Sequence, residues 1–461
     1  MQQRSWTGCI SVQKSEVIFL RALKIMIPSR KTLGDATFFF EKDTGAPLVN
    51  IYIDFLCGSE VDPPGKGGRM RMAAHMLRMG TKRRSRDDLN RAVEGLGADL
   101  DVGAGHHHVS ISAHMISESF EAFAAILREV LHEPGMRRED FEKLRRETLA
   151  DIVEARQDDQ SLAYRNFRSM LFGDHPYGKR SAGRREEIER LSLEETVALI
   201  GDPLRRSRIL VGGAGDVDEG RFVETMLPVI EGLSTQAIPP MQVPPPRPPQ
   251  GLTVRLVDKP ERTQSQIYMG HLGPLARDEG YFPILVLNTA FGGTFTARLT
   301  QEIRRKRGMS YGAYSRILRA RERDAFYLWT FPSAEDTARC IRIQLEMLEE
   351  LRGGSINDEE FDFAARYLCN HYLFAVETAA LRVSLAMKEV SQDLPPGFYE
   401  NYRQSVGGVL KTSVDGEAGR FIDPRNLCVS VLCTADRVRP AVEKELEDLS
   451  PRLEVVPYDD D

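Results

Sequence analysis

One short helical segment holds a histidine at a spacing that suits metal chemistry. Residues 68–80, GRMRMAAHMLRMG, follow Pro63-Pro64 and have the apolar spacing of a helix. Arg71 and His75 are four residues apart, so they share one helix face, as two ligands of a metal ion must. A guanidinium is always protonated, however, and offers no lone pair to a metal. On its own, His75 is better interpreted as a packed, hydrogen-bonded histidine.

A second segment places an arginine and a tyrosine where they could stabilise negative charge. Residues 291–317 read FGGTFTARLTQEIRRKRGMSYGAYSRI. Arg304 lies in a predicted helix, and Tyr311 follows seven residues later, beyond a Gly-Met-Ser-Tyr-Gly turn. Both side chains donate hydrogen bonds, so a preorganised pair could stabilise an oxyanion. Without further context, Arg304 could equally be one more charge in the solvated basic run 304–307.

Both segments resemble the pitrilysin and mitochondrial-processing-peptidase family of zinc peptidases, the inverzincins, whose metal helix carries H-x-x-E-H. The resemblance extends over nearly the whole chain. In the family motif, Arg71 replaces the first His, Ala74 replaces the Glu, and only His75 is kept. The family's third ligand, a Glu on a later helix, aligns with Asp151, which shares its helix face with Glu147 and Glu154.

The resemblance therefore implies a degenerate zinc site. His75 and Asp151 are two ligands at most, whereas a catalytic zinc ion normally has three protein ligands. Ala74 cannot accept a proton from a metal-bound water, which is the role of the family glutamate. We expect this chain to bind no cofactor, with zinc held in a partner chain.

The same resemblance assigns Arg304 and Tyr311 to the family's Arg/Tyr pair, which stabilises the substrate carbonyl as it becomes an oxyanion. Some members of the family are built from two chains, one with the zinc motif and one with this pair. We expect this chain to be the second kind, with a zinc-bearing paralogous subunit as partner and peptides as substrate. The alternatives are an active zinc endopeptidase with a rebuilt ligand set, a non-enzymatic peptide-binding or assembly subunit, and an inert paralogue.

A cluster of histidines does not fit this scheme. Residues 107–114, HHVSISAH, alternate like a strand, which would place His106, His108 and His114 on one face. A divergent metal site formed with His75 is possible chemistry, but no zinc spacing rule is met. We interpret the histidines as a polar strand face lining the substrate chamber.

Two similar halves must position these residues. Residues 238–250, IPPMQVPPPRPPQ, contain seven prolines and predict an extended linker between an N-terminal half, 1–237, and a C-terminal half, 251–461. Asp202-Pro203 and Asp423-Pro424 precede similar apolar runs at an offset of 221 residues, which indicates an internal repeat.

Each half mixes strands and helices without a regular βα period. Residues 48–56 alternate like a strand, and residues 120–132 and 138–156 have helical spacing. Gly212 to Gly215 lack the phosphate-loop pattern and are interpreted as a strand-to-helix turn. We predict an α+β fold of two homologous halves, each an antiparallel sheet covered by helices, that together form a clam-like chamber.

Composition excludes several classes of protein. The 461 residues are 41% hydrophobic and 28% charged, as in a globular protein, and the net charge of −6 gives no basic footprint for nucleic acid. No apolar run is long enough to span a membrane. Arg21 and Lys24 interrupt the most apolar N-terminal stretch, 17–28, which is therefore a poor secretory signal. We expect a cytoplasmic protein with no membrane span.

Overall fold

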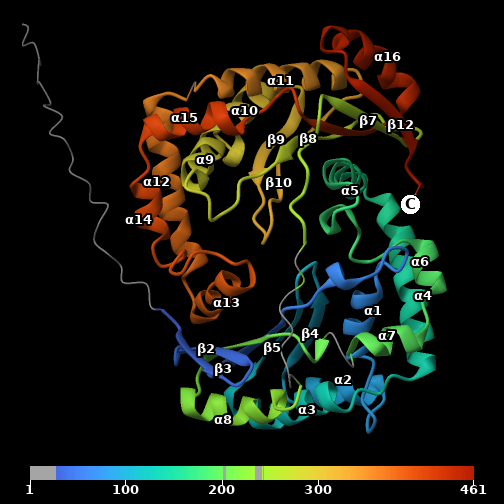
Figure 1. Ribbon diagram of the computed structural model, residues 1–461, viewed down its shortest axis with the longest axis vertical. Coiled ribbons are helices and arrows are strands. Elements are labelled where there is room, and N and C mark those ends of the chain that lie inside the picture. Colours follow the sequence, from blue (N-terminus) through green and yellow to red (C-terminus); the bar gives the residue numbers. More distant parts are fainter. Residues whose placement is uncertain (1–26, 201–203, 234–240, 242, 355, 461) are drawn as a thin grey trace, which may run out of the picture.

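The structure is a computed structural model that describes residues 27–200, 204–233, 241, 243–354 and 356–460. Most of the apolar stretch 17–28, the Asp202-Pro203 pair and part of the proposed linker lie outside the described residues. The described residues form two six-stranded sheets that face each other across the molecule (Figure 1). The fold is α+β with two similar halves, as predicted.

The first half has six strands and eight α-helices among its described residues. They are β1 (Ser29–Leu33), β2 (Ala36–Lys42), β3 (Leu48–Phe55), α1 (Arg69–Met76), α2 (Arg86–Glu94), β4 (Asp99–Ala104), β5 (Val109–Ile116), α3 (Phe120–His132), α4 (Arg138–Glu154), α5 (Asp159–Phe172), α6 (Arg185–Arg190), α7 (Leu193–Leu199), β6 (Ile209–Gly215) and α8 (Glu219–Ile230). Helix α3 coincides with the predicted helix 120–132, and strand β3 ends one residue before the prediction.

The second half repeats this arrangement, also with six strands and eight α-helices among its described residues. Its elements are β7 (Thr253–Asp258), β8 (Gln266–Leu272), α9 (Tyr281–Asn288), the π-helical segment η6 (Thr289–Gly293), α10 (Arg298–Thr300), the π-helical segment η7 (Gln301–Lys306), β9 (Ser310–Ile317), β10 (Ala325–Pro332), α11 (Thr337–Arg352), α12 (Asp358–Ala375), α13 (Ala379–Ser391), α14 (Tyr402–Gly407), α15 (Lys411–Phe421), β11 (Cys428–Cys433), α16 (Ala435–Glu445) and β12 (Arg452–Pro457).

The strand orders show that the halves are related. The first sheet runs β1-β2-β6-β3-β5-β4 and the second runs β12-β7-β11-β8-β10-β9. The orders correspond strand by strand, except that the outer edge is filled by β1 before β2 in one half and by β12 after β11 in the other. The sheets are mixed rather than wholly antiparallel, because β2 pairs with β6, and β7 with β11 and β12, in parallel.

Helices cover the outer face of each sheet, and the pattern of buried residues follows from this. Helices α3 and α8 lie below the first sheet in Figure 1, and α11 and α16 lie above the second. Strand β11, CVSVLC, is buried along its whole length. Its Val429 and Val431 belong to the outer core, whereas Cys428 and Leu432 pack on the inner face. A central strand that is covered on both faces has a continuous run of apolar residues, and not an alternation of apolar and polar ones.

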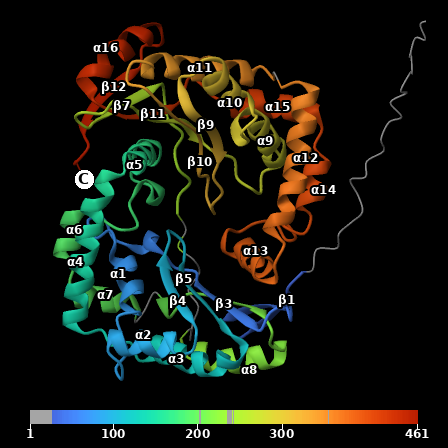
Figure 2. The same ribbon diagram turned by 180° about the vertical axis from the view of Figure 1, so that it is seen from behind.

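The inner face of the second sheet is covered by a helix from the first half. Helix α5 begins after Asp158, whose Oδ1 accepts the N–H groups of Gln160 and Ser161 at 3.0 and 3.2 Å. Its apolar residues pack on strands β7, β8 and β11 of the other half, in a cluster that includes Phe167 and Tyr268. Both views place α5 inside the molecule, against the second sheet (Figures 1 and 2).

The reverse exchange occurs at the first sheet. Val383 and Met387 of helix α13 pack on Leu210 of β6. A Cβ atom on Gly212 would lie 2.4 Å from the sulfur of Met387, so the close approach of α13 requires glycine there. Gly212 to Gly215 therefore belong to strand β6, and the predicted strand-to-helix turn is wrong.

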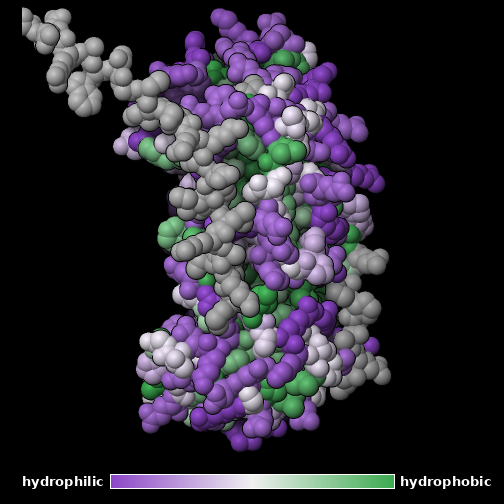
Figure 3. Space-filling model, turned by 90° about the vertical axis from the view of Figure 1, so that its left-hand side faces the viewer, coloured by the Kyte–Doolittle hydropathy of each residue, from purple (hydrophilic) through white to green (hydrophobic). Residues whose placement is uncertain are grey.

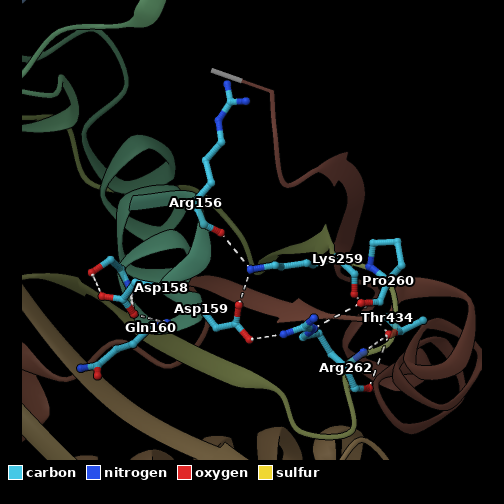
Figure 4. A network of polar contacts seen from close by, with 9 residues as sticks. Arg156, Asp158, Asp159, Gln160, Lys259, Pro260, Arg262 and Thr434 are labelled. Atoms are coloured by element: carbon cyan, nitrogen blue, oxygen red, sulfur yellow. Dashed lines mark hydrogen bonds and ion pairs between the residues drawn. The ribbon is translucent and has the colours of Figure 1, made fainter. Parts of the chain in front are cut away.

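An ion-pair network ties α5 to the second half (Figure 4). The Lys259 ammonium donates to the carbonyl oxygen of Arg156 at 2.8 Å and to Oδ1 of Asp159 at 2.6 Å. Arg262 donates to the other Asp159 oxygen at 3.3 Å, and Thr434 accepts the Arg262 backbone N–H at 2.8 Å. Because Lys259 is 5% exposed, these contacts replace the water that its charge would otherwise need.

Candidate functional site

Helix α1 holds Arg71, Ala74 and His75, the residues that the resemblance aligns with the family's zinc motif. Its Met70, Ala73 and Ala74 pack in the main core of the first half, whereas Met72 and Met76 pack in a smaller apolar cluster; Ala74 is fully buried. The helix starts at Gly68, which has φ of +84°, and Asp62 Oδ1 accepts the N–H of Met70 at 2.9 Å. Arg71 and His75 lie on the partly exposed face, as their four-residue spacing predicted.

His75 lies between opposing charges. Burial lowers its pKa first, and the positive charges of Arg71 and Arg78 lower it further, while Asp151 acts in the opposite direction. His75 is therefore neutral at physiological pH. Asp151 is exposed on α4 and lines one cavity together with Arg71.

These residues do not fit zinc in the family manner. The first ligand position is a guanidinium, and the position of the catalytic carboxylate is a buried methyl group. Over the part of the chain that the structure describes, no three His, Cys, Asp or Glu side chains lie close enough together to hold a metal ion. We therefore derive no metal chemistry from this chain's own residues.

The histidine cluster is a turn and not a strand face. His106 to His108 precede β5, which begins at Val109, so the predicted shared face with His114 is wrong. Nδ1 of His107 lies 2.7 Å from Glu60 Oε2, and its Nε2 lies 2.5 Å from the hydroxyl of Tyr177. The alternation of HHVSISAH predicts a strand that includes these histidines, because the alternating pattern continues through the turn that precedes β5.

The burial of His106 predicts a pH-dependent stability. Burial, followed by the charge of Arg168, lowers the pKa of His106 to about 4. In the unfolded chain a histidine titrates near pH 6.5, so between pH 6.5 and 4 the unfolded state binds more protons, and the folded state loses stability as the pH falls. At pH 5 we expect this residue to cost about 2 kcal/mol relative to pH 7.5.

Urea unfolding at pH 7.5 and pH 5.0 tests this for the wild-type chain and the H106Q variant. The variant should lose less stability than the wild type between the two pH values, by about the same 2 kcal/mol. Equal losses in the two proteins would contradict the assignment.

In the second half, the structure brings Arg304 and Tyr311 together. Cζ of Arg304 lies 4.9 Å from the centre of the Tyr311 ring and 4.5 Å from that of Phe295. Both rings make cation–π contacts with the guanidinium. Tyr311 is 80% exposed and Phe295 is 58% exposed, so this cluster is open to an approaching molecule.

Local structure explains this arrangement. Arg304 lies in η7, a π-helical segment of a kind that is frequent at functional sites. Gly308 has φ of +66° and donates its N–H to the carbonyl oxygen of Arg304 at 3.1 Å, which turns the chain back toward β9. Thr300 Oγ1 donates to the carbonyl oxygen of Ala313 at 2.7 Å and fixes α10 against β9.

The cavity beside α1 contains residues that sequence analysis did not identify. It measures about 390 Å³ and is lined by Arg71, Asp151 and His106, and by Arg165, Arg168, Lys179 and Arg180. Arg304 and Tyr311 are not among its lining residues, so the structure does not join the two candidate sites within this one chain. The available signal was the spacing of Arg165 and Arg168, which share one face of α5.

Family models match most of the chain. The model described as "Insulinase (Peptidase family M16)" matches residues 37–184, and the model described as "Peptidase M16 inactive domain" matches residues 190–368. The chain belongs to peptidase family M16. The resemblance proposed from the sequence is confirmed; the first model lies within the first half, and the second begins at the end of the first half and continues into the second.

Relatives within the M16 family carry different names. A Mycobacterium leprae protein named "uncharacterized zinc protease" is 25% identical over 374 residues, covering 80% of this chain and 83% of that protein. A Helicobacter pylori protein named "non-peptidase homolog" is 20% identical over 384 residues, covering 80% of this chain and 84% of that one. A solved Pseudomonas fluorescens M16 inactive domain superposes with a TM-score of 0.80 at 20% identity, covering 88% of this chain and 98% of that one, which shows the shared fold.

One face of this M16 chain is largely polar. Figure 3 shows hydrophilic side chains over most of one face, with hydrophobic ones scattered among them. None of the described helices has both the length and the apolar composition that a membrane crossing would need.

Proposed function

We propose that this chain is the zinc-poor subunit of an M16 peptidase, and that it contributes Arg304 and Tyr311 to peptide-bond hydrolysis by a zinc-bearing paralogous chain. The observation that carries the proposal is the contrast between its two sites. Arg304 and Tyr311 lie in contact, with the tyrosine exposed, whereas the positions aligned with the zinc motif lack one ligand and the catalytic carboxylate.

The Arg304 cluster suits oxyanion stabilisation. The cation–π contacts with Phe295 and Tyr311 hold the guanidinium in place, and its N–H groups can donate to a substrate oxygen. Among the described residues, no carboxylate lies within 4.0 Å of Arg304, so no intramolecular ion pair must be broken when a substrate oxygen becomes negative. Donors fixed in advance need no reorganisation during the reaction. The zinc ion of the partner would supply the activated water.

Peptides are the proposed substrates, and the cytoplasm is the proposed compartment. Strands β4 and β9 end their sheets, so each has one edge without a neighbouring strand in the sheet order. An extended peptide can add to such an edge through backbone hydrogen bonds. Tyr311 is the second residue of β9, which would bring an added peptide beside the Arg/Tyr pair.

The direct test measures bound zinc and peptide hydrolysis for the purified chain alone, for its zinc-bearing paralogue alone, and for the mixture. We expect no stoichiometric zinc in this chain and strong hydrolysis only in the mixture. Stoichiometric zinc with chelator-sensitive cleavage by the chain alone would refute the proposal and favour a rebuilt ligand set.

A non-enzymatic peptide-binding or assembly subunit is the second candidate. It is favoured by one observation, the loss of both the first ligand and the catalytic carboxylate at α1. The mixture separates the two functions, because an assembly subunit would bind the paralogue without raising its rate of hydrolysis.

A further inference from the structure

The cavity beside α1 has a different charge from that of a metal site. A metal site is built from lone-pair donors, and its protein ligands are neutral or negative. This cavity is lined instead by five cationic side chains and one carboxylate, that of Asp151. The cations are Arg71, Arg165, Arg168, Lys179 and Arg180.

Only part of this positive charge is neutralised inside the protein. Arg168 donates to Asp324 at 2.7 Å, and both side chains are about nine-tenths buried, at 14% and 13% exposed. Arg71 and Lys179 have no carboxylate within 4.0 Å among the described residues, although Asp151 lines the same cavity as Arg71. Arg71 and Lys179 together carry more charge than the single carboxylate of the cavity, Asp151, and this excess of positive charge favours an anion.

Part of the cavity wall is apolar. Ile152 and Ala155 come from the end of α4 and the turn after it, Tyr164 from α5, and Tyr177 from the loop beyond it. A volume of about 390 Å³ suits a small ligand or the end of a longer one. A second cavity, of about 880 Å³, shares Arg165, Lys179 and Arg180 with the first and extends to the second half at Arg255 and Val456. A chain-like ligand could thus enter the first cavity with one end and continue into the second.

We propose that this cavity binds the C-terminal carboxylate of a peptide whose last residue is apolar. Arg71 and Lys179 would pair with the carboxylate, and Ile152 and Tyr164 would contact the last side chain. Arg71 stands where the family has a metal ligand, so a guanidinium provides positive charge at this point of α1. A guanidinium binds a carboxylate well, because its N–H groups match the two carboxylate oxygens.

The shape and charge of the cavity select this ligand over other anions. Nucleic acid needs a broad basic surface, and the chain has a net charge of −6. A free inorganic anion would make no use of the apolar walls, whereas a peptide end supplies a single negative charge next to a side chain. The inference rests on the proposed function in one respect only, since it takes a peptide as the ligand.

Fluorescence anisotropy with the full-length chain alone tests this. The probes are one labelled unstructured peptide ending in leucine, made with a free C-terminal carboxylate and as the C-terminal amide. We expect the wild-type chain to bind the free acid at least 10-fold more tightly than the amide. The R71M and K179M variants should each lose most of this preference, while their affinity for the amide stays unchanged.

The R78M variant is the matched control. Arg78 lies just beyond α1, pairs with Asp101 at 3.1 Å, and does not line the cavity, so its replacement should leave the preference intact. Circular dichroism and thermal unfolding check that all variants fold. Equal binding of acid and amide by the wild type, no binding of either, or equal effects of R71M and R78M would overturn the proposal. The assay needs no partner chain and no hydrolysis, so its failure is distinguishable from failure of the proposed function.

Discussion

Replacing Arg304 by alanine is expected to lower kcat of the reconstituted peptidase pair by about 100-fold to 1,000-fold, with little change in KM. An oxyanion donor interacts more strongly with the transition state than with the bound peptide, so its loss appears in kcat. The measurement is steady-state hydrolysis of an unstructured peptide by the mixture of this chain and its zinc-bearing paralogue. Y311F should lower kcat in the same direction, because it removes the second donor.

Arg305 provides the control for this experiment. It is exposed in the same basic run, and its Nη1 donates to Gln301 Oε1 at 3.1 Å. R305A removes one positive charge from the same surface and should keep kcat within about twofold, as a surface substitution usually does. If R304A keeps the wild-type kcat, or if R305A lowers it as far as R304A does, Arg304 is not the oxyanion donor.

Replacing Phe167 by alanine is expected to lower the free energy of unfolding by about 3–5 kcal/mol. Phe167 is fully buried on α5, with ring centres 6.2 Å from Tyr268 and 6.1 Å from Tyr327 of the second half. The rings surrounding Phe167 come from a rigid sheet and cannot collapse to fill the space. The loss should therefore include a cavity cost in addition to the lost apolar contact.

Urea unfolding followed by far-ultraviolet circular dichroism measures this change. F374A is the control, because Phe374 is 66% exposed on α12 and its truncation should cost less than about 0.5 kcal/mol. A loss below about 1 kcal/mol for F167A would show that α5 does not hold the second sheet as described. A single transition in both variants is expected, because each half covers part of the other half's core.

Local features could be predicted from the sequence. The apolar period of residues 120–132 marks both ends of α3, because an amphipathic helix on the outer face of a sheet keeps its full pattern. Arg304 and Tyr311 were expected together and lie together, because a short turn at Gly308 connects them. Neither feature depends on contacts far away in the chain.

Long-range features could not be predicted. The apolar residues of α5 show that the helix is covered, but its pattern does not show that the cover is the sheet of the other half. The turn predicted at Gly212 is wrong because glycine is present there for a long-range reason. It makes room for the sulfur of Met387, 175 residues later in the chain (387 − 212). The cationic cavity was missed for the same reason, since Arg71, Arg168 and Lys179 come from three separate segments.

The exchange of α5 and α13 between the halves has a consequence for synthesis on the ribosome. The apolar face of α5, with Leu162, Phe167 and Leu171, is complete long before β11, the last of the three strands that it covers. Strand β11 begins 256 residues after α5 ends (428 − 172), which is on the order of 10 to 50 s of translation. During that time the nascent N-terminal half exposes an aromatic helix face. We expect this exposed apolar face to be prone to aggregation until the C-terminal strands emerge and cover it.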